Sequence, residues 1–99
     1  MKTIMLACAG GMSTSLLVTK MQKSAAKQGA EYNILAVGVD AVPDQFKKYR
    51  PQVILLGPQV NYMLETVRQA VPVPVEVIDR KEYGMMDGEK VLEQALSLI

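Results

Sequence analysis

The stretch that decides the fold covers residues 3–16 and reads TIMLACAGGMSTSL. Its first part, Thr3 to Ala7, is apolar almost throughout, which predicts a strand buried on both faces of a sheet. A loop containing Gly10 and Gly11 follows at once, and a helical pattern begins near Thr14. A buried strand, a tight loop and a helix in this order are typical of an α/β fold with a parallel sheet.

The rest of the chain alternates short apolar runs with helical patterns. We predict further strands over 32–39, 53–56 and 75–78, helices over 14–28, 43–49, 61–70 and 88–98, and a polar loop over 79–87. These elements form a small four-stranded, doubly wound parallel sheet, and right-handed crossovers give it the strand order 2-1-3-4. Ligands bind such sheets where the strand order reverses, beyond the carboxyl ends of the strands. This places Cys8 beside the segment 57–59.

The composition narrows the classes of function. A chain of 99 residues predicts one domain, spanning residues 1–99. The formal net charge is +1 and no basic run is present, so we do not expect nucleic acid as a partner. The apolar stretches are too short for a membrane helix or a secretory signal, and we therefore expect a cytoplasmic protein.

The chain contains no histidine and a single cysteine, Cys8. Within one chain, this excludes a Cys/His zinc cluster, a disulfide and any Ser-His or Cys-His nucleophile pair. We expect neither a metal nor a cofactor. If Cys8 reacts, then backbone dipoles, hydroxyl groups or a partner protein must activate it.

The loop after the first strand has the features of an anion-binding site. Gly10 and Gly11 adopt positive φ at little cost, so successive backbone N–H groups can turn toward one point. The following helix adds free N–H groups and the positive end of its dipole. Ser13, Thr14 and Ser15 can cap that helix or donate hydroxyl groups. A thiol at the start of this loop would face a positive site that favours both a thiolate and a phosphate dianion.

Other phosphate-binding motifs fit less well. The Walker A and dinucleotide fingerprints are absent. The tyrosine-phosphatase loop has a cysteine followed after five residues by an arginine, and Thr14 occupies that place here. Without the guanidinium there is no bidentate clamp for a pentavalent transition state. A low-molecular-weight phosphatase-like hydrolase is therefore disfavoured. A non-catalytic flavodoxin-like binding module, with Cys8 as a small buried hydrophobe, is the other alternative.

The sequence resembles the IIB component of the lactose/cellobiose/chitobiose class of the bacterial phosphoenolpyruvate-dependent sugar phosphotransferase system. The likeness covers nearly the whole chain. It rests on Cys8 with GMSTSL at 11–16, LGPQ at 56–59 with Tyr62-Met63, PVEVID at 74–79, and the pairs Tyr83-Gly84 and Asp87-Gly88. This chain departs from the pattern at residues 9–11, where Ala-Gly-Gly replaces the Ser-Ala-Gly common in related sequences.

The resemblance implies a flavodoxin or low-molecular-weight phosphatase-like fold and a phosphotransferase activity. In this family, the cysteine accepts a phosphoryl group from a phosphohistidine of a IIA protein and donates it to a sugar held by the membrane IIC component. Cys8 would be the nucleophile, and the sugar would be of the β-glucoside or disaccharide class. The phosphate would be wrapped by the backbone amides of the loop residues Ala9, Gly10, Gly11, Met12, Ser13, Thr14, Ser15 and Leu16.

Three further side chains are candidates for the same site. Gln59 follows the third predicted strand and can orient the loop, meet a partner or simply begin a helix. Asp79 and Tyr83 follow the fourth predicted strand and can line the rim or serve surface and packing roles. Met12, at the loop tip, can form an adaptable partner surface, together with Met85 and Met86.

Overall fold

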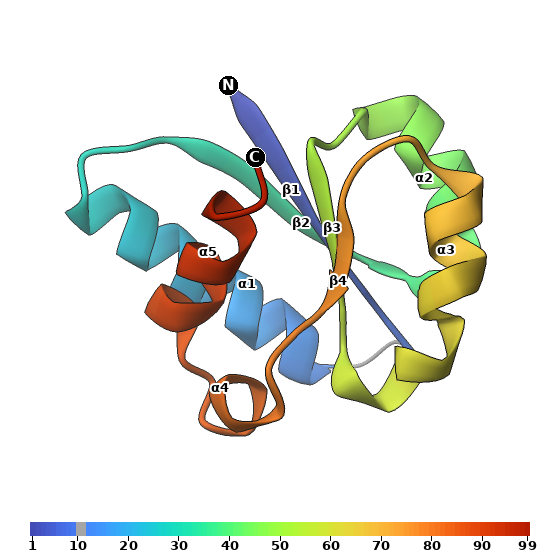
Figure 1. The fold of residues 1–99 in the computed structure, drawn as a ribbon. Helices are drawn as coiled ribbons and strands as arrows, with labels where there is room; N and C mark the ends of the chain where they lie inside the picture. Colours follow the sequence, from blue (N-terminus) through green and yellow to red (C-terminus); the bar gives the residue numbers. More distant parts are fainter. Residues whose placement is uncertain (10–11) are drawn as a thin grey trace.

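The computed structural model describes residues 1–9 and 12–99, without the side chains of Met12 and Ser13. Within these residues, four parallel strands form one sheet in the order β2-β1-β3-β4 (Figure 1). The strands are β1 (Lys2–Cys8), β2 (Tyr32–Gly38), β3 (Val53–Leu56) and β4 (Val75–Val77). The fold class and the strand order predicted from the sequence are confirmed.

The central strand β1 is buried on both faces because its side chains alternate between two cores. Ile4 and Leu6 pack into one core, whereas Met5 and Ala7 pack into the other. All four residues are fully buried. A side-chain period of two on an unbroken apolar run produces this arrangement and fixes β1 in the middle of the sheet.

Helices cover both faces of the sheet (Figure 1). The helices α1 (Met12–Lys27) and α5 (Gly88–Leu96) pack on one face, and α2 (Val42–Tyr49) and α3 (Leu64–Ala70) on the other. Short 3-10 turns precede α2 and α3, at Val39–Ala41 and Pro58–Met63. The described residues contain no helix that is both long and apolar enough to cross a lipid bilayer.

Several predictions about the elements are wrong in detail. Residues 61–63, predicted to begin a helix, belong to the 3-10 turn Pro58–Met63. The segment 79–87, predicted to be a polar loop, contains the helix α4 (Arg80–Gly84). Asp79 caps α4, because its Oδ1 accepts hydrogen bonds from the backbone N–H groups of Lys81 at 2.9 Å and Glu82 at 3.3 Å. The first helix begins at Met12 and not at Thr14, which brings Met12 and Ser13 into α1.

Candidate functional site

Cys8 is the last residue of β1 and lies at the point where the strand order reverses. It pairs with Gly38 of β2 on one side. On the other side, the N–H of Gly57, directly after β3, donates to the carbonyl oxygen of Ala7 at 2.8 Å. The predicted neighbourhood of Cys8 and the segment after β3 is therefore present in the structure. Only 6% of the surface of Cys8 is exposed.

Gly57 separates Cys8 from the side chain of Gln59. A Cβ atom added at Gly57 would lie 3.0 Å from Gln59 Oε1 and 3.4 Å from the Cβ of Cys8. Gly57 has an ordinary extended conformation, with φ of −62°, so the glycine serves close approach and not an unusual backbone angle. The exposed side chain of Gln59 folds back toward Gly57, so that its Oε1 and the Cβ of Cys8 both lie next to this glycine.

A hydrogen bond between side chains joins the start of α1 to α4. Thr14 Oγ1 lies 3.3 Å from the hydroxyl oxygen of Tyr83, although the two residues are 69 positions apart in the chain. Thr14 is 97% buried. The ring of Tyr83 packs against the core shared by α1 and α5. The structure thus brings one of the candidate rim residues, Tyr83, into contact with the predicted phosphate-binding loop.

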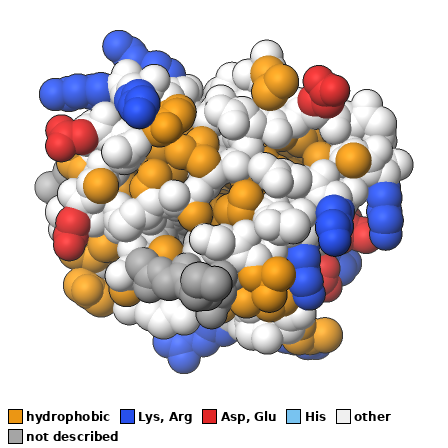
Figure 2. Space-filling view, turned by 180° about the vertical axis from the view of Figure 1, so that it is seen from behind, with side chains coloured by type: hydrophobic (Ala, Val, Ile, Leu, Met, Phe, Trp, Pro, Cys, Tyr) orange, Lys and Arg blue, Asp and Glu red, His pale blue; other side chains and the backbone are white. Residues whose placement is uncertain are grey.

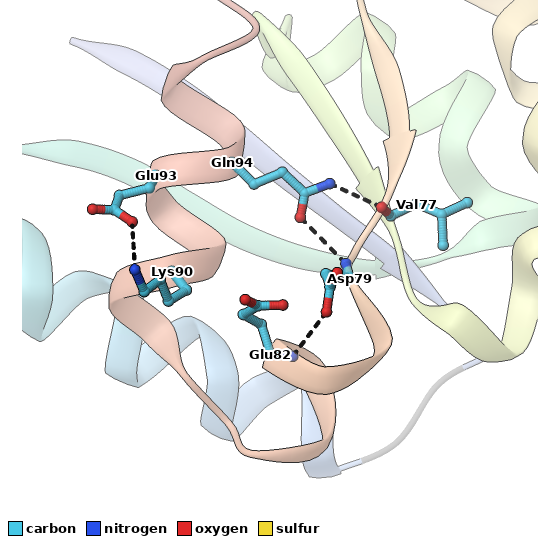
Figure 3. A pocket seen from close by; sticks show the side chains of 6 residues that line it. All are labelled: Val77, Asp79, Glu82, Lys90, Glu93 and Gln94. Atoms are coloured by element: carbon cyan, nitrogen blue, oxygen red, sulfur yellow. Dashed lines mark hydrogen bonds and ion pairs between the residues drawn. The ribbon is translucent and has the colours of Figure 1, made fainter.

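Asp79 and its neighbours line a pocket between the end of β4, α4 and α5, shown in Figure 3. This open pocket has a volume of about 440 Å³ and is lined by Val77, Asp79, Glu82, Lys90, Glu93 and Gln94. The side chain of Gln94 bridges two points of the chain here. Its Nε2 donates to the carbonyl oxygen of Val77 at 2.9 Å, and its Oε1 accepts from the N–H of Asp79 at 3.3 Å. The role of Gln94 is not predictable from the sequence, because nothing local distinguishes it from a surface glutamine.

The carboxyl groups of Asp79 and Glu82 share a hydrogen bond that shifts both pKa values. This bond, together with two backbone N–H groups, lowers the pKa of Asp79. The same bond, together with burial, raises the pKa of Glu82. As a carboxylate, Glu82 Oε2 is buried with no hydrogen-bond partner among the described residues. A hydrogen bond between two carboxyl groups needs a proton on one of them, and the raised pKa of Glu82 makes it the group of the pair that keeps a proton to the higher pH.

The other residues of the predicted loop are described only in part. Gly10 and Gly11, and the side chains of Met12 and Ser13, lie outside the described residues. Ala9 and Ser15 are exposed. The Ser15 carbonyl oxygen accepts a bond from Thr19 Oγ1 at 3.2 Å within the helix.

Three large apolar side chains are exposed on segments that follow the strand ends. Leu16 on α1 is 49% exposed, Tyr62 before α3 is 75% exposed, and Met85 after α4 is 66% exposed. Met86, by contrast, packs against the core. Figure 2 shows hydrophobic side chains across the middle of one face, with Lys and Arg side chains gathered toward its margins.

The fold and the site together define a class of protein. A parallel sheet of order 2-1-3-4, with a cysteine ending its central strand at the switch point, is a flavodoxin-like α/β domain with a thiol at the edge where sheets of this kind bind their ligands. The chain belongs to the lactose/cellobiose-specific IIB family of the phosphotransferase system. The family model described as "PTS system, Lactose/Cellobiose specific IIB subunit" matches residues 3–94.

Individual relatives agree with this assignment. The chain is 46% identical to the oligo-beta-mannoside-specific EIIB component of the phosphotransferase system of Bacillus subtilis (strain 168), over 100% of this chain and 97% of the relative. It is also 46% identical to the galactose-specific EIIB component of Lactococcus lactis subsp. cremoris (strain MG1363), over 99% of this chain and 96% of that protein. The predicted family membership is thereby confirmed.

Solved structures give the same result. The cellobiose-specific IIB component from Borrelia burgdorferi superposes with a TM-score of 0.79 at 32% identity, covering 98% of this chain and 90% of that one. The lactose-specific IIB domain from Streptococcus pneumoniae has a TM-score of 0.83 at 17% identity, covering 98% and 96%, and shows the shared fold. The protein is a IIB component of the lactose/cellobiose class, and it is a phosphotransferase of a sugar transport system.

Proposed function

We propose that residues 1–99 form one phosphocarrier domain, in which Cys8 accepts a phosphoryl group from a IIA phosphohistidine and donates it to a sugar bound by a membrane IIC component. One observation carries this proposal. The only cysteine of the chain ends the central strand at the switch point of the sheet, and the 16-residue helix α1 begins four residues later. The positive end of a helix of this length stabilises an anion placed before it.

The chemistry consists of two in-line displacements at phosphorus. In the first, the Cys8 thiolate attacks the phosphohistidine, so that an S–P bond forms, the P–N bond breaks and the imidazole of IIA leaves. In the second, a sugar hydroxyl oxygen attacks the phosphocysteine. A P–O bond then forms, the P–S bond breaks, the thiolate is restored and the hydroxyl proton passes to a base. Both transition states carry spread negative charge, which preorganised N–H groups stabilise.

The loop 9–16 is the proposed phosphate-binding segment. Its backbone amides and the first turn of α1 would hold the phosphoryl oxygens. Gln59, whose Oε1 lies next to Gly57, as does the Cβ of Cys8, can rotate to donate from Nε2 to the phosphoryl group. Asp79 supports the site through its α4 cap.

The proposed partners follow from the same scheme. A IIA protein brings the histidine that this chain lacks, and a IIC component brings the sugar. The exposed apolar side chains Leu16, Tyr62 and Met85 fit a face that docks transiently on other proteins. We propose a cytoplasmic location with association at the membrane through IIC. Neither a cofactor, a metal nor a nucleic acid enters the scheme.

The test is phosphoryl transfer from a phosphorylated IIA protein of this class. The wild type should gain one phosphoryl group on Cys8, detected by intact mass and peptide mapping. Cys8→Ser and Cys8→Ala should gain none and should retain the wild-type fold by circular dichroism. A phosphoryl group found on a serine, or no uptake by the wild type from any matched IIA protein, would contradict the proposal.

The deep burial of Cys8 also favours a second candidate, a binding module in which the cysteine is only part of the core. The two are separated by alkylation of the native protein. A thiol at an anion site reacts with iodoacetamide as the pH rises, and orthophosphate protects it. A thiol that serves packing alone reacts only on unfolding, and phosphate has no effect on its rate.

A further inference from the structure

We propose that Tyr83 is a positioning residue for phosphoryl transfer, acting through Thr14. The inference rests on the proposed function, because Thr14 belongs to the segment that would hold the phosphoryl group. It goes beyond that function by assigning the hydroxyl of Tyr83 one task. This hydroxyl sets the direction of the Thr14 hydroxyl and fixes the first turn of α1.

The geometry supports this task. Thr14 is the third residue of α1 and is 97% buried, so its hydroxyl needs a partner inside the protein. The structure supplies one in the hydroxyl of Tyr83, at 3.3 Å. A distance of 3.3 Å is long for a bond between two hydroxyl groups, whose usual separation is about 2.7–2.8 Å. Such contacts tighten when a charged ligand polarises the chain of bonds.

The number of hydroxyl protons then fixes the direction of the Thr14–Tyr83 hydrogen bond in the phosphorylated state. Each hydroxyl has one proton to donate. A phosphoryl dianion only accepts, so Thr14 can serve it only by donating its single proton. Tyr83 must then donate its own proton to Thr14 Oγ1. The chain of donors runs from Tyr83 to Thr14 to the phosphoryl oxygen, and each bond strengthens the next.

Tyr83 is held well enough to perform this task. Its ring packs against the core between α1 and α5. The helix that carries it is capped by Asp79, and the start of this segment is fixed to α5 through Gln94. A side chain with a partly buried, packed ring and a braced backbone loses little entropy when its hydroxyl makes a bond. The site therefore has a rigid outer support.

The experiment compares Tyr83→Phe with the wild type in single-turnover transfer from phosphorylated IIA. Tyr83→Phe keeps the ring and removes only the hydroxyl. We expect the maximal rate to fall about threefold to tenfold, as the loss of one hydrogen bond predicts, with the half-saturating IIA concentration unchanged. The matched control is Tyr32→Phe, because Tyr32 packs against the same core from the first residue of β2. It should leave both parameters unchanged.

A double-mutant cycle shows whether Tyr83 acts through Thr14. Thr14→Val should lower the rate by itself, and adding Tyr83→Phe to it should lower the rate no further. Thr14→Ser, which restores the hydroxyl, should recover the sensitivity to Tyr83→Phe. Additive losses, or an unchanged rate in Tyr83→Phe, would overturn the inference while leaving the phosphocarrier function intact.

A binding measurement separates failure of the inference from failure of the proposed function. Orthophosphate titrated into the protein should shift the backbone amide signals of the first turn of α1. Tyr83→Phe should weaken this binding about threefold, whereas Tyr32→Phe should not. If the wild type takes no phosphoryl group from IIA, the proposed function fails, and this result still shows whether the Tyr83 hydroxyl supports anion binding at α1. Equal binding by wild type and Tyr83→Phe, or no saturable shift in α1, would reject that role.

Discussion

The helices α1 and α5 lie on the same face of the sheet and differ in how their amino ends are neutralised (Figure 1). The start of α5 is neutralised by its own carboxylates. Asp87 Oδ1 accepts from the N–H of Lys90 at 3.1 Å, and Glu89 lies in the first turn. The start of α1 has no acidic residue in its first turn. The dipole of α5 thus has acidic residues of the chain at its positive end, whereas the first turn of α1 carries none.

This difference bears on the proposed phosphate site before α1. A carboxylate at the start of α1 would stabilise the helix by a few tenths of a kcal/mol to about 1 kcal/mol. The helix α5 has this stabilisation, and the helix that follows Cys8 lacks it. The contrast supports an anionic ligand before α1. Substitutions at the two helix ends test the contrast, and the largest effect lies at the contact between the helices.

The largest effect is expected for Gly88→Ala. A Cβ atom at position 88 would lie 2.5 Å from the carbonyl carbon of Lys20 and 2.7 Å from the backbone nitrogen of Met21. Backbone atoms cannot rotate away, so α5 must shift from α1. We expect a loss of about 2–3 kcal/mol in the free energy of unfolding, measured with urea. Gly84→Ala is the control, because nothing lies within 4 Å of a Cβ there. An equal loss in both variants would contradict the assigned contact.

The second prediction places a carboxylate at the start of α1. Ser15→Glu introduces the charge on an exposed position near the end of the first turn. We expect the rate of phosphoryl uptake to fall about threefold to tenfold, because the added charge repels the incoming group and occupies the helix dipole. The matched neutral variant, Ser15→Gln, should change the rate by less than about twofold. If the two variants slow uptake equally, bulk and not charge is responsible.

The third prediction removes the carboxylate at the start of α5. Asp87→Ala deletes the bond to the Lys90 N–H, so the free energy of unfolding should fall by about 0.5–1 kcal/mol. The phosphoryl uptake rate should stay at the wild-type value, because this helix end has no task in transfer. Asp87→Asn, which keeps a capping oxygen, should recover most of the stability. A lower phosphoryl uptake rate in fully folded Asp87→Ala would show that the start of α5 also takes part in transfer, which contradicts the contrast between the two helix ends.

The sequence predicted those parts of the molecule whose signals are local. The aliphatic runs of β1 and β3 and the right-handed crossover rule were enough to place Cys8 beside Gly57 and Gln59. The helix α4 was missed, because five residues are too few to display a helical period. The contacts Thr14–Tyr83 and Gln94–Val77 join segments that are distant in the chain, and the residue types alone do not predict such pairs.

The smallest effect is expected from the amino end of α4, where Asp79 caps the helix and shares a hydrogen bond with Glu82. This bond raises the pKa of Glu82 above its ordinary value of 4.5, so its stabilising effect is present at low pH and is lost as the pH rises through the folded pKa. The pKa of Asp79 is lowered below its ordinary value of 3.8, so its effect is present above that value and is lost as the pH falls through the folded pKa. The contribution of the pair should therefore be greatest near pH 4 and decline on both sides.

Urea unfolding of the wild type and of Glu82→Gln from pH 3 to pH 6.5 tests this dependence. The glutamine amide can donate to the Asp79 carboxylate at every pH in this range. The Glu82→Gln variant should therefore become gradually more stable relative to the wild type as the pH rises above 4.5. Lys81→Met serves as a control, because it removes a nearby charge that acts on both carboxyl groups but leaves their mutual bond. A difference that is constant with pH would show that the two carboxyl groups titrate independently, and α4 would then be held by the Asp79 cap alone.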